Sequence, residues 1–309
     1  MHTILGAGGA IGTPLAKNLK EIHGKRVRIV GRKPEKVNPD DELFVADLLD
    51  ADAVHRAVAG SAVAYLCVGL PYKAKLWARE WPRLMQHVLD ACKAHGTKLV
   101  FVDNVYMYAP EALPHMTERS VIKPTSKKGR VRKQVVDMLL GAVNRGELQA
   151  LIARSADFYG PDIRNSILLE LVYKNLKKGR QALWLCDATK THSFTYTPDA
   201  GKAIAVLGNR DEAYNRVWHL PTAHDKLTGS DWVRLFAEKL QVKPKLFVLK
   251  RWLLKLAGLV VLFMREVEET SYQYQCDYFF DSSDIEQTFG LTATPITQAL
   301  SEIVTSEPR

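Results

Sequence analysis

The feature that most constrains the fold of this chain is the regular alternation of strand and helix patterns through its first half. Short apolar runs alternate with segments in which apolar residues recur every three or four positions. The run AVAYLCVG (62–69) is almost wholly apolar, as is typical of a strand buried on both faces. The patterns predict strands at 2–5, 25–31, 42–47, 62–69, 98–104 and 148–154, and helices at 13–23, 50–59, 77–95 and 131–143. This alternation predicts an α/β protein with a doubly wound parallel sheet and helices on both faces.

The second half of the chain is less regular. After Gly160-Pro161, helical patterns alternate with short strand candidates between clusters of Pro, Gly and Thr. We therefore expect residues 1–160 to form the sheet domain, with 190–215 returning to it. The remaining segments, 161–189 and 216–309, are expected to form a smaller lobe.

A glycine-rich loop lies between the first predicted strand and the first predicted helix. It reads GAGGAIG, and it consists of Gly6, Ala7, Gly8, Gly9, Ala10, Ile11 and Gly12. Glycines without Cβ atoms allow a tight turn and a close approach to a pyrophosphate, and the following helix N-terminus presents free N–H groups and a positive dipole end. Ala10 and Ile11 are expected to pack behind the loop. In this context the loop predicts a Rossmann-type dinucleotide site.

The end of the second predicted strand indicates which dinucleotide binds. An NAD site usually carries an acidic residue there, which holds the ribose 2′-OH. This chain has VGRKPEK (30–36), so Arg32 and Lys33 stand where that acid is expected. A guanidinium suits a phosphate, and the two cations therefore predict NADP(H) rather than NAD(H). The alternative is that both are solvated charges at a strand end.

Two further strand ends are candidate cofactor contacts. Asp47-Leu48 closes the third predicted strand, where a carboxylate is placed to meet the adenine amino group. Val68-Gly69 closes the fourth, where the backbone is expected to pass the second ribose. Each of these signals is weak when taken alone.

Composition excludes several classes of protein. The formal charge of +9 favours anionic partners without choosing among them. The four cysteines form no Cys-x-x-Cys pair and the histidine spacings match no standard metal site, so no metal is predicted. No signal peptide is predicted. The apolar stretch 252–264 is too short to span a bilayer and is expected to be a core or lobe helix, with membrane-surface contact as the less favoured alternative.

The chain resembles the extended short-chain dehydrogenase/reductase superfamily, which includes nucleotide-sugar epimerases and dehydratases. The resemblance is carried by GAGGAIG (6–12), FVDNVYMYAP (101–110), RSADFYGP (154–161) and HSFTYTPDAGKAI (192–204), with FFDSSDIEQTFGLTATPITQAL (279–300) near the end. It implies a Rossmann core with a small C-terminal substrate lobe and a nicotinamide cofactor.

The catalytic motif departs from that superfamily. Such enzymes use a Ser or Thr after the fifth strand and then Tyr-x-x-x-Lys, in which the Lys holds the nicotinamide ribose and lowers the pKa of the Tyr. Aligning FVDNVYMYA places Asn104 at the Ser position, Gly129 at the Tyr position and Lys133 at the Lys position. Gly129, Lys133 and Asp137 lie on one side of the predicted helix, away from its apolar stripe. That side faces either a cofactor cleft or water. The resemblance thus implies a ribose contact for Lys133.

Tyr106 is the preferred replacement for the missing acid, with Tyr159 as a second candidate and a packed aromatic as the alternative reading of each. Asn104 is expected to hydrogen-bond a carbonyl. The other cations of SKKGRVRK (126–133), namely Lys127, Lys128, Arg130 and Arg132, are expected to form a solvated helix start.

Three functions remain open at this point. The first is an atypical NADPH-dependent oxidoreductase that reduces a carbonyl or activated double bond of a small organic substrate. The others are a nucleotide-sugar epimerase or dehydratase, and a non-catalytic NADP(H)-responsive binding protein. We expect a cytoplasmic monomer or homodimer that binds neither nucleic acid, because no aromatic residues interleave with the cations of 123–133, nor membrane.

Overall fold

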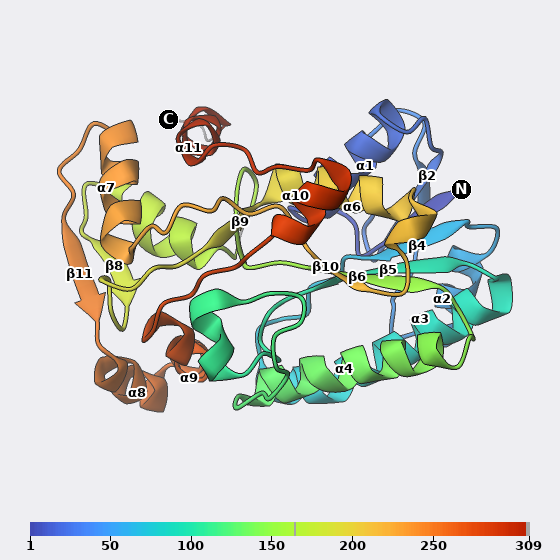
Figure 1. Ribbon diagram of the computed structural model, residues 1–309, viewed down its shortest axis with the longest axis horizontal. Coiled ribbons are helices and arrows are strands. Elements are labelled where there is room, and N and C mark those ends of the chain that lie inside the picture. Colours follow the sequence, from blue (N-terminus) through green and yellow to red (C-terminus); the bar gives the residue numbers. More distant parts are fainter. Residues whose placement is uncertain (164, 307–309) are drawn as a thin grey trace.

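A seven-stranded parallel sheet forms the centre of the computed structural model, which describes residues 1–163 and 165–306 (Figure 1). Its order is β10-β6-β5-β4-β1-β2-β3, and every neighbouring pair is parallel. The strands are β1 (His2–Leu5), β2 (Val27–Gly31), β3 (Glu42–Val45), β4 (Val63–Leu66), β5 (Lys98–Asp103), β6 (Ala150–Arg154) and β10 (Val217–His219). This is the doubly wound Rossmann order, and it confirms the predicted fold class.

Helices cover both faces of the sheet because their apolar stripes need a partner. One face carries α1 (Gly12–Glu21) and α6 (Thr197–Gly208), which pack on each other and on the sheet. The other face carries α2 (Ala51–Val58), α3 (Ala74–His95) and α4 (Lys127–Asn144). Capping fixes several of these ends: the Asp50 side chain accepts from Ala53 N before α2, and left-handed Gly96 ends α3.

The lobe has a separate apolar core at the end of the molecule away from β2 and β3 (Figure 1). It contains two short sheets, β8 (Ala182–Leu185) with β11 (Leu246–Leu249) and β7 (Asp157–Tyr159) with β9 (Phe194–Tyr196). Its helical parts are a π-helical turn (Leu169–Tyr173), α5 (Lys174–Lys177), α7 (Gly229–Lys239), α8 (Arg251–Val260), α9 (Leu262–Glu268) and α11 (Ile296–Ser306), with 3-10 turns at Pro110–His115, Asp211–Ala213 and Ser271–Tyr274 elsewhere in the chain.

Several segments differ from the prediction. The strands β7 and β9 lie in ranges expected for the sheet domain but pair with each other in the lobe. The lobe was expected to hold all of 216–309, but β10 forms an edge of the central sheet, and Ile285 of α10 (Ser283–Phe289) packs in the sheet core. The stretch 252–264 is also not a core helix. It is split between α8 and α9 at Val261, and most of its apolar side chains are exposed.

Candidate functional site

The glycine loop is built against the ends of two strands. The backbone N–H groups of Gly6 and Ala7 both donate to Val30 O, at 3.0 and 3.2 Å. Gly6 has a φ of +87°, and a Cβ there would lie 2.5 Å from Val68 Cα, so only glycine fits between β1 and β4. The loop is therefore clamped where β1, β2 and β4 end.

The outer side of the loop is open. Gly8 has a φ of +98°, and a Cβ added at Gly8 or Gly9 would meet nothing within 4 Å. Behind the loop, Ile11 packs in the sheet core, Ala10 is half-buried, and buried Gly12 begins α1. Exposed backbone in front of a helix N-terminus is a suitable cradle for a pyrophosphate.

Arg32 and Lys33 follow β2 directly, beside this loop. Both side chains are exposed, and neither makes an ion pair or side-chain hydrogen bond with another described residue. Their charges are therefore available to an external anion.

The other predicted cofactor contacts lie at neighbouring strand ends. Asp47 is exposed after β3, and one of its carboxylate oxygens accepts from Leu49 N at 3.0 Å. Leu48 is buried. Val68 is half-buried against Gly6, and exposed Gly69 faces open space. These positions share the sheet edge that carries the loop, and their contacts with a cofactor stay predictions.

Arg132 is not a solvated cation. Its guanidinium donates to Asp103 Oδ1, with an Nη2–Oδ1 distance of 2.5 Å, and lies over the rings of Trp81 and Phe101. Arg154 donates to the other oxygen of Asp103, at 3.0 and 3.2 Å. All three charged side chains are almost fully buried. The pairs hold α4 and β6 to the carboxyl end of β5.

Lys128 also corrects the expectation of a solvated helix start. Its side chain is 0% exposed, and its ammonium donates to Glu266 at 2.6 Å and to Glu269 at 2.9 Å. It lies 4.3 Å from the centre of the Tyr72 ring. A buried cation needs such partners, so Lys128 fastens α4 to α9 and the segment after it.

Gly129 is packed so tightly that no side chain fits. A Cβ there would lie 2.2 Å from Tyr106 O and 2.9 Å from the Ser126 hydroxyl, which caps α4 by accepting from Gly129 N. Lys133 lies further along the helix, 42% exposed, with its ammonium 2.5 Å from Asp137. No hydrogen bond among the described residues joins Lys133 to Asn104 or Tyr106, and its ribose contact stays a prediction.

Tyr106 follows β5 at the predicted catalytic edge. Its hydroxyl accepts a hydrogen bond from the Tyr72 hydroxyl at 3.2 Å, the Tyr72 hydroxyl lies 2.9 Å from that of Thr270, and the Tyr106 ring stacks on Trp77. Asn104 Oδ1 accepts from Tyr106 N at 3.1 Å, which shapes the loop. Burial, with neighbouring Tyr72, raises the pKa of Tyr106 well above its usual range, so the phenol is protonated at neutral pH.

A polar and aromatic cluster near Tyr106 was not predicted. Asp157 accepts hydrogen bonds from Tyr274 at 3.0 Å and from His192 at 3.1 Å. The His192 ring is stacked between Tyr274 and Tyr278, with centroids 4.2 and 4.1 Å away. Asp157 lies within the quoted motif RSADFYGP, so the motif was a usable signal, but its partners come from distant segments.

Tyr159 and His219 have structural roles in the described chain. Tyr159 is buried among the aromatic side chains of the lobe. His219 lies 2.7 Å from the Tyr108 hydroxyl, which accepts from Arg154. Burial, with Arg154 nearby, lowers the pKa of His219 to about 3, so its ring is neutral.

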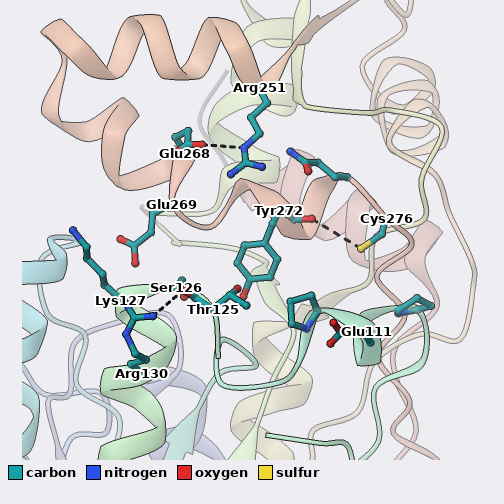
Figure 2. Close-up of a pocket in the computed structure, with 13 residues that line it drawn as sticks. Glu111, Thr125, Ser126, Lys127, Arg130, Arg251, Glu268, Glu269, Tyr272 and Cys276 are labelled. Carbon is teal, nitrogen blue, oxygen red and sulfur yellow. Dashed lines mark hydrogen bonds and ion pairs between the residues drawn. The ribbon is translucent and has the colours of Figure 1, made fainter. Parts of the chain in front are cut away.

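An open pocket of about 800 Å³ lies between the N-terminus of α4 and the lobe (Figure 2). Arg251 pairs with Glu268 on one side, at 2.9 Å, and the Tyr272 ring crosses the middle (Figure 2). The lining residues are Pro110, Glu111, Pro114, Thr125, Ser126, Lys127, Arg130, Arg251, Glu268, Glu269, Tyr272, Gln275 and Cys276. The lining combines cationic and anionic side chains with apolar surface, which suits a small molecule that carries polar groups.

The sheet order and the loop at its switch point define a dinucleotide-binding Rossmann protein. The model of the NAD dependent epimerase/dehydratase family matches residues 2–219, and the chain belongs to that family.

Known proteins support this assignment. A uronate dehydrogenase from Pseudomonas syringae pv. tomato is 25% identical over an alignment of 254 residues, and the match covers 78% of this chain and 80% of that protein. A dTDP-glucose 4,6-dehydratase from Streptomyces venezuelae, solved with NAD bound, superposes with a TM-score of 0.79 and 16% identity over 99% of this chain and 96% of that one. A UDP-glucose 4-epimerase from Thermotoga maritima, solved with UDP-glucose, superposes with a TM-score of 0.79 and 15% identity over 99% of this chain and 98% of that one. These two structural likenesses show the shared fold.

Replacing Gly129 by Ala is expected to lower the free energy of unfolding by about 1–3 kcal/mol, because the new methyl overlaps a backbone oxygen. Chemical denaturation measures this loss. Gly141→Ala is the matched control in α4, since its Cβ would meet only the mobile end of Arg145, at 3.3 Å. It should be neutral or slightly stabilising. Equal stability of the two variants would contradict the packing at Gly129.

Proposed function

We propose that this protein is an NADPH-dependent oxidoreductase that reduces a carbonyl or activated double bond of a small polar organic substrate. The observation that carries the proposal is the open glycine loop beside two unpaired cations at the end of β2. The family uses a nicotinamide dinucleotide, and Arg32 and Lys33 provide the charge that a 2′-phosphate requires.

The residues present fit such a cofactor. The backbone of Gly8 and Gly9 and the N-terminus of α1 would hold the pyrophosphate, and Asp47 and Gly69 stand where the adenine and the second ribose are expected. When bound, the nicotinamide supplies hydride.

Protein groups must then supply the proton. Tyr106 is protonated at neutral pH because burial raises its pKa, and within the described chain no hydrogen bond joins its hydroxyl to a cation. The buried ammonium of Lys128 is held by Glu266 and Glu269. The neutral phenol carries the proton that a reduction requires and does not accept one, although its raised pKa makes it a weaker acid than an unperturbed tyrosine. This supports reduction as the favoured direction, with Tyr106 as donor and Tyr72 orienting it.

The similarity to a uronate dehydrogenase supports a carbohydrate or related polyhydroxy compound as the substrate class. Charged and hydroxyl-bearing side chains in the pocket at the start of α4, among them Arg130, Glu269 and Tyr272, support the same choice. We propose that a soluble small molecule enters there and that the protein acts in the cytoplasm as a monomer or homodimer.

Thermal unfolding with each of the four nicotinamide dinucleotides tests the cofactor. NADPH at 100 times its Kd is expected to add about 2.7 kcal/mol of stability, and NADH at the same concentration much less. Sugar lactones, aldoses and keto acids are then screened for NADPH oxidation by absorbance. Equal stabilisation by NADH and NADPH would reject the NADPH preference.

A second function is favoured by the packing of Gly129, which excludes a side chain at the usual tyrosine position. In this alternative the chain is a non-catalytic protein that binds NADP(H) and changes its affinity for a partner in response. Stabilisation by NADPH together with no oxidation across the whole screen would favour this alternative.

A further inference from the structure

The hairpin formed by α8 and α9, residues 251–268, lies at the edge of the lobe (Figure 1). It leaves seven large apolar side chains exposed. Val260 is 89% exposed and Leu259 82%, and these values exceed those of every other large apolar side chain described. The members of the surface are Trp252, Leu256, Leu259, Val260, Val261, Leu262 and Phe263. Monomeric soluble proteins rarely leave such a contiguous patch in water.

This exposure is not a by-product of packing. Leu254 and Val267 are buried and anchor the two helices in the lobe core, and a Cβ at Gly258 would lie 3.1 Å from Arg265 Cα, so the helices are closely crossed. On α8, the exposed residues recur at i, i+4, i+7 and i+8 from Trp252, which places them on one face. The hairpin therefore has one face for the lobe and one that the described chain leaves uncovered.

The acidic and basic side chains around this face differ in whether they form ion pairs. The acidic residues of the segment are engaged inside the protein, Glu266 and Glu269 by Lys128 and Glu268 by Arg251. In contrast, three exposed cations, Lys250, Lys255 and Arg265, make no ion pair or side-chain hydrogen bond with any described residue. The apolar face is thus bordered by cations that form no ion pair within the described chain.

We propose that this hairpin docks the protein on an anionic lipid surface. An amphipathic helix with Trp, Phe and Leu on one face and cations beside it binds at the headgroup boundary, where apolar burial and attraction to acidic lipid act together. A second copy of the chain fits less well, because a two-fold contact brings the same cations of both copies to one interface. No helix in the described parts of the chain is long and apolar enough to cross a bilayer, so docking is peripheral. The inference replaces the expectation of no membrane partner and does not depend on the cofactor.

Co-sedimentation with vesicles tests the proposal. The full chain is mixed with vesicles of phosphatidylglycerol and phosphatidylcholine in equal parts, or of phosphatidylcholine alone, at low and high salt. We expect binding to the anionic vesicles that weakens with salt. Val260→Asp should lower the partition coefficient about tenfold or more, since it replaces buried apolar area by a charge. Lys255→Gln should lower it about fivefold.

Val121→Asp is the matched control, because Val121 is 65% exposed and lies outside the hairpin. It introduces the same change and is expected to leave vesicle binding unaltered. Absence of binding to anionic vesicles, or equal loss in Val121→Asp and Val260→Asp, would overturn the proposal. The proposal would also be overturned if the wild-type protein is a dimer that does not bind vesicles and if Val260→Asp makes it monomeric. That result would identify the surface as a subunit contact.

Discussion

Replacing Arg32 and Lys33 together by Ala is expected to raise the Kd for NADPH about a hundredfold or more while leaving the Kd for NADH within about twofold. Each cation contributes a charge-assisted contact of about 1.5–3 kcal/mol to a phosphate, and NADH lacks that phosphate. Both side chains are exposed and unpaired within the described chain, so their removal leaves the fold intact. Titration calorimetry with both cofactors measures the change.

A nearby control separates this effect from general electrostatics. Lys17 and Lys36 are also exposed cations of the sheet domain, but Lys17 lies on α1, and Lys36, five residues beyond β2, donates to Pro39 O at 2.8 Å. The variant Lys17→Ala, Lys36→Ala removes the same charge and is expected to change NADPH affinity by less than about threefold at physiological salt. If the two double variants weaken NADPH equally, Arg32 and Lys33 have no specific role.

Replacing Tyr106 by Phe is expected to lower kcat for NADPH-dependent reduction about a hundredfold, because general acid catalysis usually contributes at least that factor. The ring and its stacking on Trp77 are kept, so NADPH should stabilise the variant as it does the parent. The raised pKa of Tyr106 sets the pH dependence. The acid form persists through neutral and mildly alkaline pH, so deprotonation of Tyr106 should not reduce the rate below about pH 10.

Tyr72→Phe is the control for Tyr106. It removes the hydroxyl that lies 3.2 Å from that of Tyr106 but keeps the proposed donor. We expect a smaller fall in kcat, about tenfold or less, since only the orientation of the donor is lost. Full turnover in Tyr106→Phe would reject the donor, and the NADPH stabilisation would still report on the cofactor site.

The sheet edge that carries the glycine loop was predictable from the sequence because its signals are local. The loop 6–12, the strand before it and the helix after it are consecutive, and Arg32 follows its strand directly. In a parallel sheet these carboxyl ends meet at one edge whatever the details of packing.

The roles of Lys128 and Arg132 were not predictable in this way. Their partners stand 138, 141 and 29 residues away, at Glu266, Glu269 and Asp103. A helical pattern shows which residues share a face but not which distant carboxylate meets them. Five cations in eight residues therefore suggested a solvated helix start. In the structure, long-range ion pairs bury two of the five, Lys128 and Arg132.

The hairpin 251–268 illustrates the opposite limit. Its apolar spacing is that of an amphipathic helix, and such a pattern predicts burial without naming what covers the apolar face. Here most of the large apolar side chains lie on the face directed away from the lobe core.

The close contact between Gly129 and Tyr106 O has a chemical consequence. A tyrosine side chain introduced at position 129 would overlap the backbone oxygen of Tyr106. We therefore expect such a substitution to destabilise the fold, whatever it contributes to catalysis. Return to the usual chemistry requires α4 to move outward first, and that movement strains the ion pairs of Lys128 and Arg132. As the chain packs, a proton donor such as the proposed Tyr106 therefore has to come from outside this position of α4.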